Sequence, residues 1–234
     1  MWLLSLREPP AVQREYLAML AGDERDRADR FHHDRDREAY IAARGGLRLI
    51  LSGYLQCAPG EVRFDYGSHG KPLLAPGQYH GDLQFNLAHS GDLAVCGVTE
   101  ARPMGIDIER HRQLDDMAQV ARHVFSPQEN DVLWSLPAEL REQAFFNAWT
   151  RKEAYIKGRG LGLALRLDTF DVTLAPDQPA GLLATREDPA EASRWKLCSL
   201  PMPAGYTAAL AVAGDGWQAR LLQYGSRADA GLSS

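Results

Sequence analysis

Apolar residues recur at helical spacing in two stretches of the chain. Residues 11–55 are predicted to be helical, with a charge-rich break in the middle, GDERDRADRFHHDRDRE. Beyond the break, one helical face carries four large apolar residues: Tyr40, Leu47, Leu51 and Tyr54. Gly45 and Gly46 interrupt this helix at a cost of about 1 kcal/mol each relative to Ala, so we expect close packing there. The second helical stretch covers residues 115–125 and 139–157.

Short runs typical of β-strands follow each helical stretch. They cover residues 61–66, 83–89, 93–100 and 104–110 in the first half, and 169–174, 194–200, 206–214 and 217–224 in the second. Helices followed by small antiparallel sheets, twice over, predict an α+β protein, a pseudo-dimer of two similar halves. We place the halves at residues 1–105 and 106–225, with a tail of no apolar pattern at residues 226–234.

Composition places the chain among ordinary globular proteins. Of its 234 residues, 45% are hydrophobic and 24% are charged, and no apolar run is long enough for a membrane span or a signal-peptide core. The three cysteines are scattered, and Cys96 lies in an apolar strand where we expect it to be buried. We therefore expect a cytoplasmic protein without a membrane partner. The net charge of −5 argues against nucleic acid as a partner.

Three carboxylates are predicted to converge. Alternate residues of a strand share a face, so Asp107 and Glu109 of the segment GIDIER point the same way. Two such charges repel by roughly 4 kcal/mol at 4 Å in an effective dielectric of about 20. Helical spacing places Glu153 on the apolar sector of residues 139–157, where an unpaired charge is costly. A divalent cation would stabilise all three, and all-oxygen ligands favour Mg²⁺ or Mn²⁺ over zinc.

Each of these features also has a structural interpretation. An acidic pair on a strand is more often a solvated edge than a metal site. Glu153 and Lys157 are spaced for a surface ion pair, which contributes about 0.3–0.5 kcal/mol. Lys71 in the turn GSHGKP and His89 at a strand end are candidate phosphate ligands, although turn lysines and single histidines more often have structural roles. Gly158 is predicted to cap the end of its helix.

Five motifs in one order resemble those of a known family. They are HGKPLL (69–74), FNLAHSGD (85–92), GIDIER (105–110), FSPQE (125–129) and WTRKEAYIKGRGLGL (149–163). The combination is similar to the 4′-phosphopantetheinyl transferases, and most closely to the surfactin-synthetase-activating (Sfp-like) type. Each motif alone is weak, but together they span most of residues 27–175.

The resemblance implies a fold and a reaction. Sfp-like members are pseudo-dimers of two α+β halves with the active site in the cleft between them. They move the 4′-phosphopantetheine group of coenzyme A onto a serine of an apo acyl or peptidyl carrier protein and release adenosine 3′,5′-bisphosphate. The reaction requires Mg²⁺. A monomer is expected, since the pseudo-dimer would already complete the cleft.

The resemblance also assigns roles to residues. Asp107, Glu109 and Glu153 would hold Mg²⁺, and Lys157 would contact the pyrophosphate. Either Glu153 or Glu129 would accept the serine proton. The expected coenzyme A contacts, besides Asp107 and Lys157, are Arg27, Gly70, Lys71, Asn86, His89 and Ser90.

Two positions depart from the family pattern, and two other functions compete. Ala88 stands where many relatives carry serine, and Glu24 stands where some carry a second basic residue. Both changes weaken the expected binding of coenzyme A.

A metal-dependent nuclease also uses acidic pairs with a lysine, but it predicts a basic groove and closer spacing than Glu153 and Lys157 show. An inert carrier-binding module would keep the fold without turnover.

Overall fold

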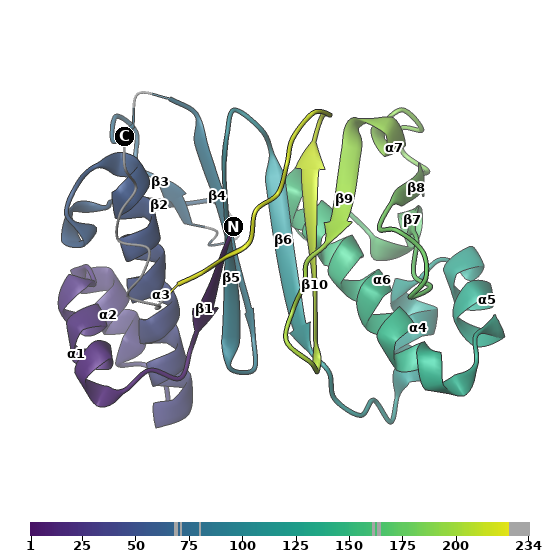
Figure 1. Cartoon of the computed structure of the whole chain (residues 1–234), viewed down its shortest axis with the longest axis horizontal. Coiled ribbons are helices and arrows are strands. Elements are labelled where there is room, and N and C mark those ends of the chain that lie inside the picture. The colour runs from purple at the N-terminus through teal and green to yellow at the C-terminus, as the bar shows by residue number, and fades with distance from the viewer. Residues whose placement is uncertain (68–69, 71, 80, 161, 163–164, 225–234) are drawn as a thin grey trace. The chain divides into compact units, whose positions relative to one another are not determined.

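The computed structural model describes residues 1–67, 70, 72–79, 81–160, 162 and 165–224 (Figure 1). The chain folds into two compact units that do not follow the sequence in two blocks. Unit 1 is made of residues 1–81, 91–96 and 220–234, and unit 2 is made of residues 82–90 and 97–219. The predicted division into residues 1–105 and 106–225 stays a prediction, as does the site in a cleft between halves, and the tail 226–234 lies outside the described residues.

Unit 1 places three helices beside short strands. The helices are α1 (Pro10–Met19), α2 (Gly22–Ala28) and α3 (Asp34–Leu55), followed by a 3₁₀ turn, Pro59–Glu61. Strand β1 (Trp2–Ser5) pairs antiparallel with the first residues of β5 (Leu93–Glu100) and parallel with β11 (Leu222–Gln223). Strands β2 (Phe64–Tyr66) and β3 (Pro72–Leu74) form a separate antiparallel pair.

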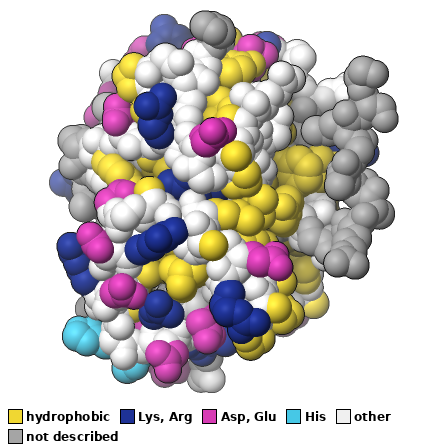
Figure 2. Space-filling model, turned by 90° about the vertical axis from the view of Figure 1, so that its left-hand side faces the viewer, with side chains coloured by type: hydrophobic (Ala, Val, Ile, Leu, Met, Phe, Trp, Pro, Cys, Tyr) yellow, Lys and Arg dark blue, Asp and Glu magenta, His cyan; other side chains and the backbone are white. Residues whose placement is uncertain are grey.

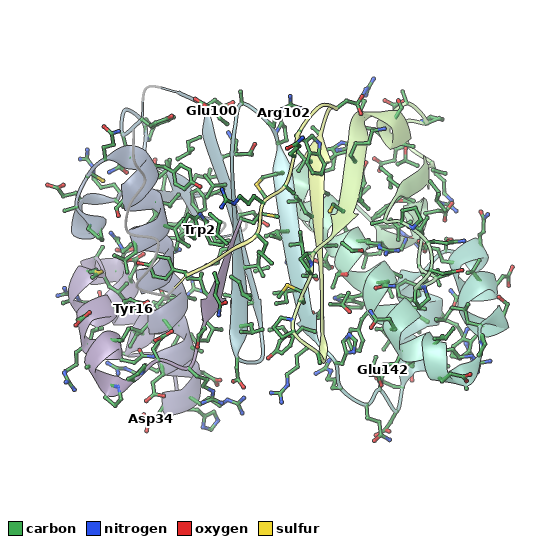
Figure 3. All side chains as sticks on the ribbon, viewed as in Figure 1. Trp2, Tyr16, Asp34, Glu100, Arg102 and Glu142 are labelled. Atoms are coloured by element: carbon green, nitrogen blue, oxygen red, sulfur yellow. The ribbon has the colours of Figure 1, made fainter. Side chains whose placement is uncertain are left out.

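The prediction of close packing at Gly45 and Gly46 is confirmed. A Cβ atom on Gly45 would lie 2.5 Å from the Tyr16 side chain, and one on Gly46 would lie 2.7 Å from Leu4. Tyr16 lies between α1 and α3 (Figure 3). Cys96 of β5 is fully buried, as expected.

Glu24 has a structural explanation in unit 1. Its carboxylate is 1% exposed and forms ion pairs with Arg44 at 2.8 Å and Arg48 at 2.7 Å. Because a buried charge needs such partners, the acidic side chain at this position joins α2 to α3. The face that the unit 1 helices present carries acidic and basic side chains intermixed, without a patch of one sign (Figure 2).

Unit 2 is a helix packed on a three-stranded antiparallel sheet. The sheet has the order β6 (Met104–Arg110), β10 (Tyr206–Ala213) and β9 (Trp195–Ser199). Helix α6 (Ala138–Arg159) packs on β6 and β10 (Figure 1). The surrounding elements are β4 (Leu83–Ser90), α4 (Met117–Val124), α5 (Pro127–Ser135), a 3₁₀ turn (Leu167–Thr169), β7 (Phe170–Val172), β8 (Leu182–Thr185) and α7 (Glu191–Arg194).

The sequence patterns missed five helices and strands and misplaced two boundaries. Strands β1, β3 and β8 and helices α5 and α7 are all short, and their patterns do not stand out from the flanking residues. The strand predicted over 217–224 is reduced to Leu222–Gln223. Gly158 lies inside α6, so its prediction as the cap is wrong: the helix ends at Gly160, whose positive φ of 68° suits a left-handed cap.

The described helices do not suit a bilayer. None of them combines the length and the apolar composition that crossing a membrane requires.

Candidate active site

Two glycines let strand β6 and helix α6 approach closely. A Cβ atom on Gly105 would lie 2.1 Å from the Ala154 carbonyl oxygen and 2.2 Å from the Gly158 nitrogen. A Cβ atom on Gly158 would lie 2.6 Å from the Trp195 ring. No side chain fits at these distances, so backbone packs on backbone. This contact aligns the residues that follow Gly105 on the strand with those that precede Gly158 on the helix.

Asp107 is the most buried carboxylate of the predicted metal set. It is 5% exposed, and its Oδ1 accepts a hydrogen bond from Lys157 Nζ at 2.5 Å. Its second oxygen, Oδ2, is also buried and has no hydrogen-bond partner among the described residues. Burial raises the pKa of Asp107 to about 7, with a smaller contribution from the charges of Glu109 and Glu153 and against the opposing effect of Lys157. A buried oxygen without a partner is costly, so this site favours a cation.

Glu153 faces the same place from the helix. It is half-buried, as the helical spacing predicted. Its pKa is raised by burial, lowered by Lys157 and raised by Glu109. The negative charges of Asp107, Glu109 and Glu153 therefore repel one another, and the positive charge of Lys157 partly offsets this repulsion.

The donor set fits a hard divalent cation. Three carboxylates, one of which has a buried oxygen without a partner among the described residues, suit Mg²⁺, which prefers oxygen ligands. Within the described part of the chain, however, no three His, Cys, Asp or Glu side chains are already arranged as a metal-ligand group. Lys157 holds one Asp107 oxygen instead, so a cation would share this carboxylate with the ammonium group.

His89 lies within electrostatic reach of this group at the end of β4. Its side chain reaches solvent, yet neighbouring protein atoms displace enough water to lower its pKa. Lys157 lowers the pKa further, and Glu109 opposes this shift. The neutral ring that results can accept or donate a hydrogen bond.

Asn86 and Ser90 contact strand β6. Asn86 is 5% exposed, and its Oδ1 accepts a hydrogen bond from the Ile106 backbone at 2.9 Å. The Ser90 hydroxyl donates to Glu109 Oε2 at 2.8 Å and accepts from the Arg110 backbone N–H at 3.1 Å. Both residues were predicted to bind coenzyme A, but the Asn86 carbonyl oxygen and the Ser90 hydroxyl are engaged within the protein.

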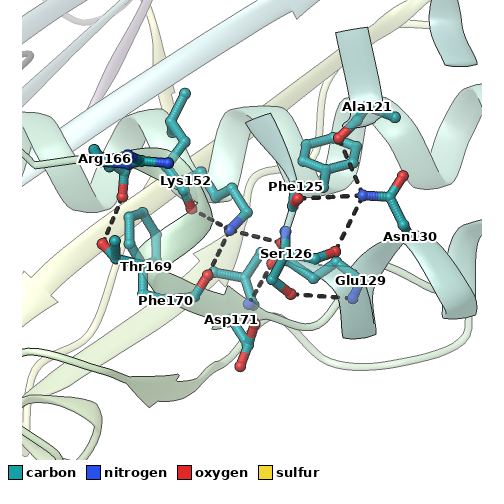
Figure 4. A network of polar contacts seen from close by, with 12 residues as sticks. Ala121, Phe125, Ser126, Glu129, Asn130, Lys152, Arg166, Thr169, Phe170 and Asp171 are labelled. Atoms are coloured by element: carbon teal, nitrogen blue, oxygen red, sulfur yellow. Dashed lines mark hydrogen bonds and ion pairs between the residues drawn. The ribbon is translucent and has the colours of Figure 1, made fainter. Parts of the chain in front are cut away.

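Glu129 belongs to a buried polar network instead of an open site (Figure 4). It is 2% exposed and pairs with Lys152 at 2.7 Å. Its two oxygens also accept the backbone N–H groups of Val172 and Ser126, both at 2.8 Å. The Ser126 hydroxyl accepts from the Glu129 N–H in return, which forms a capping box at the start of α5. Burial raises the pKa of Glu129 and the Lys152 charge opposes the rise.

The remaining predicted residues belong to unit 1. Arg27 is exposed and its guanidinium lies 5.5 Å from the centre of the Tyr40 ring. Gly70 has a positive φ of 71°, which favours glycine in this turn. Lys71 lies outside the described residues. The coenzyme A contacts expected of these residues stay predictions.

Gly105 and Gly158 were not among the predicted site residues. Their signal was in the sequence, because a glycine directly precedes the acidic pair of GIDIER and another interrupts the helix after Lys157. Such glycines mark close backbone approach. Only the three-dimensional structure shows that Gly105 and Gly158 lie against each other.

Comparison with known proteins identifies the family. A model described as 4′-phosphopantetheinyl transferase, N-terminal, matches residues 10–101, and the 4′-phosphopantetheinyl transferase superfamily model matches residues 103–211. The 4′-phosphopantetheinyl transferase HetI of Nostoc sp. is 41% identical over 96% of this chain and 91% of its own length. The chain belongs to the 4′-phosphopantetheinyl transferase superfamily.

A second relative gives its name to the predicted Sfp-like type. The 4′-phosphopantetheinyl transferase Sfp of Bacillus subtilis is 29% identical over 72% of this chain and 74% of its own length. The predicted family, the α+β class and the enzyme class are thus confirmed. The protein is an enzyme that transfers phosphopantetheine to carrier proteins, and its family uses coenzyme A as substrate.

Proposed function

We propose that this transferase moves the 4′-phosphopantetheine of coenzyme A onto a serine of an apo acyl or peptidyl carrier protein, with Mg²⁺ bound. The serine oxygen forms a bond to the phosphorus next to pantetheine. The bond from that phosphorus to the bridging oxygen breaks, and adenosine 3′,5′-bisphosphate leaves. The serine proton passes to a carboxylate of the enzyme.

One observation carries the proposal. Asp107 and Glu109 of β6 act electrostatically on Glu153 of α6, beside Lys157, and one buried Asp107 oxygen has no partner in the described part of the chain. This arrangement supports a site for a cation and a pyrophosphate. A bound Mg²⁺ would neutralise the charge of the pyrophosphate. Asp107, Glu109 and Glu153 would hold it, with Mn²⁺ as a substitute.

We assign the base to Glu153 and the anion contact to Lys157. Both Glu129 oxygens are engaged by Lys152, Val172 and Ser126, so Glu129 has no free oxygen for a serine proton. Glu153 is half-buried, and its two oxygens can serve the cation and the serine separately. The Lys157 ammonium offsets negative charge that develops on the leaving group.

We assign the binding of coenzyme A to the residues that the family pattern indicates. His89 would contact a phosphate or ribose group, and Arg27, Gly70 and Lys71 would contact the nucleotide. We further infer a monomeric, cytoplasmic enzyme that does not bind nucleic acid. Light scattering of the purified protein at several concentrations would test the monomer.

Intact-protein mass spectrometry tests the reaction. Apo carrier proteins from fatty-acid, polyketide and peptide synthetases are incubated with enzyme, coenzyme A and Mg²⁺, with and without EDTA. We expect a gain of one phosphopantetheine group that EDTA prevents. No gain on any carrier with folded enzyme would favour the inert module, and Mg²⁺-dependent cutting of plasmid DNA would favour the nuclease.

A further inference from the structure

Strand β4 holds strand β6 at two points that flank Asp107. Asn86 binds the Ile106 backbone, one residue before Asp107. Ser90 binds the Arg110 backbone and the Glu109 side chain, just after it. Because alternate residues of a strand share a face, Asn86 and Ser90 project from the same side of β4. The two contacts therefore act together on the segment that carries the acidic pair.

Ala88 lies on the same side of β4, between Asn86 and Ser90. It is 5% exposed, so a methyl group fills this position inside the protein. The absence of a serine hydroxyl here, which departs from the family pattern, leaves an apolar contact between two polar ones.

The Ser90 hydroxyl has no hydrogen left for a phosphate. A serine hydroxyl carries one donor hydrogen, and Ser90 gives it to Glu109 Oε2 at 2.8 Å. Its oxygen also accepts from the Arg110 N–H at 3.1 Å. A phosphate oxygen needs a donor, so Ser90 could bind coenzyme A only by releasing Glu109.

A hydrogen bond of this kind fixes the direction of a metal-ligating carboxylate. Glu109 has several rotatable bonds and would otherwise sample many positions. With one oxygen held by Ser90, the other is oriented, and the carboxylate loses less conformational freedom when a cation binds. Groups that orient metal ligands in this way typically change metal affinity by about 10- to 100-fold when they are removed.

We propose that Ser90 is a positioning residue that orients Glu109 for the divalent cation and does not contact coenzyme A. The inference rests on the proposed function, because it takes Glu109 to be a ligand of that cation. It replaces the predicted coenzyme A contact of Ser90 with a role inside the protein.

The test measures Mn²⁺ binding by electron paramagnetic resonance in the coenzyme A complex, without a carrier so that no turnover occurs. We expect Ser90→Ala to weaken Mn²⁺ binding about 10-fold. Ser90→Thr keeps the hydroxyl and should restore the parent affinity. Ser135→Ala is the matched control, because Ser135 only donates to the Val132 carbonyl within α5.

Steady-state kinetics separates the two roles of Ser90. At saturating Mg²⁺, the KM for coenzyme A should be the same in Ser90→Ala and the parent, whereas the Mg²⁺ concentration for half-maximal rate should rise. A higher KM for coenzyme A with unchanged Mn²⁺ affinity would overturn the inference and restore the predicted contact. If the parent enzyme itself binds no Mn²⁺, the metal site of the proposed function fails first, and the inference fails with it.

Discussion

Asp107 is the central residue of this site, because its surroundings disfavour the ionised form of its carboxylate. Its Oδ2 atom is buried without a partner among the described residues, and burial, with two further carboxylates nearby, raises its pKa to about 7. A cation that binds there recovers much of this cost. The carboxylate is therefore retained at the expense of stability, as is common for groups that serve a ligand.

Asp107→Asn should separate function from stability. The amide keeps the shape of the carboxylate but cannot balance a divalent charge, so turnover should fall by at least about 100-fold. The melting temperature should stay the same or rise, because a buried charge is removed. Mass-spectrometric turnover and thermal unfolding of the same preparation check both statements. Turnover within threefold of the parent would contradict the metal assignment.

Glu129 should show the opposite behaviour. Glu129→Ala leaves the fully buried Lys152 without its ion-pair partner, so we expect a loss of about 3–5 kcal/mol in the free energy of unfolding. Glu129→Leu combined with Lys152→Met should recover much of the loss. Urea unfolding measures the free energy of unfolding of each variant, and turnover at low temperature reports on the fraction of enzyme that remains folded. A stable Glu129→Ala protein with no turnover would instead support Glu129 as the base.

At the scale of elements, the site depends on how closely β6 and α6 approach. The spacing of residues in the sequence correctly placed Glu153 on the inward side of its helix, because helical periodicity is a local property. The sequence did not show that Gly105 packs on Gly158, because the two are far apart along the chain. The contact between Ser90 and Glu109 was not predicted for the same reason, because the two residues lie on different strands.

Gly105→Ala should push the two elements apart. Its Cβ would meet backbone atoms at 2.1 and 2.2 Å, so a backbone shift is required, at a cost of about 1–3 kcal/mol. The protein should remain folded while its turnover falls, since Asp107 and Glu109 move away from Glu153. Gly53→Ala in α3 is the control, because nothing lies within 4 Å of its Cβ position. Equal activity of the Gly105→Ala protein and the parent would show that the close approach is not required.

At the scale of the whole molecule, the two units divide the predicted roles. Unit 2 contains the carboxylates, Lys157 and His89, whereas unit 1 contains Arg27 and Gly70. The repeated order of helices and strands predicted two α+β halves because each half has its own periodic pattern. It did not predict that residues 82–90 and 97–105 join unit 2 or that residues 220–224 join unit 1, since this exchange depends on strand pairing.

This division predicts that substitutions in unit 1 act on coenzyme A and not on the metal. Arg27→Ala removes a cation from the expected nucleotide contact, so the KM for coenzyme A should rise about 10-fold while Mn²⁺ affinity stays unchanged. Arg30→Ala, another exposed arginine nearby, is the control for net charge. Isothermal titration with coenzyme A and Mn²⁺ binding distinguish the two effects. An unchanged affinity for coenzyme A would remove Arg27 from the site.

The parallel pairing of β1 with β11 has a consequence for the order of folding. It joins residues about 220 positions apart, because Trp2 pairs with Leu222. Strand β1 also pairs with β5, where Trp2 lies opposite Cys96, and this contact closes a loop of less than half that length. Since longer loops cost more entropy to close, we expect β1 to pair with β5 before it pairs with β11.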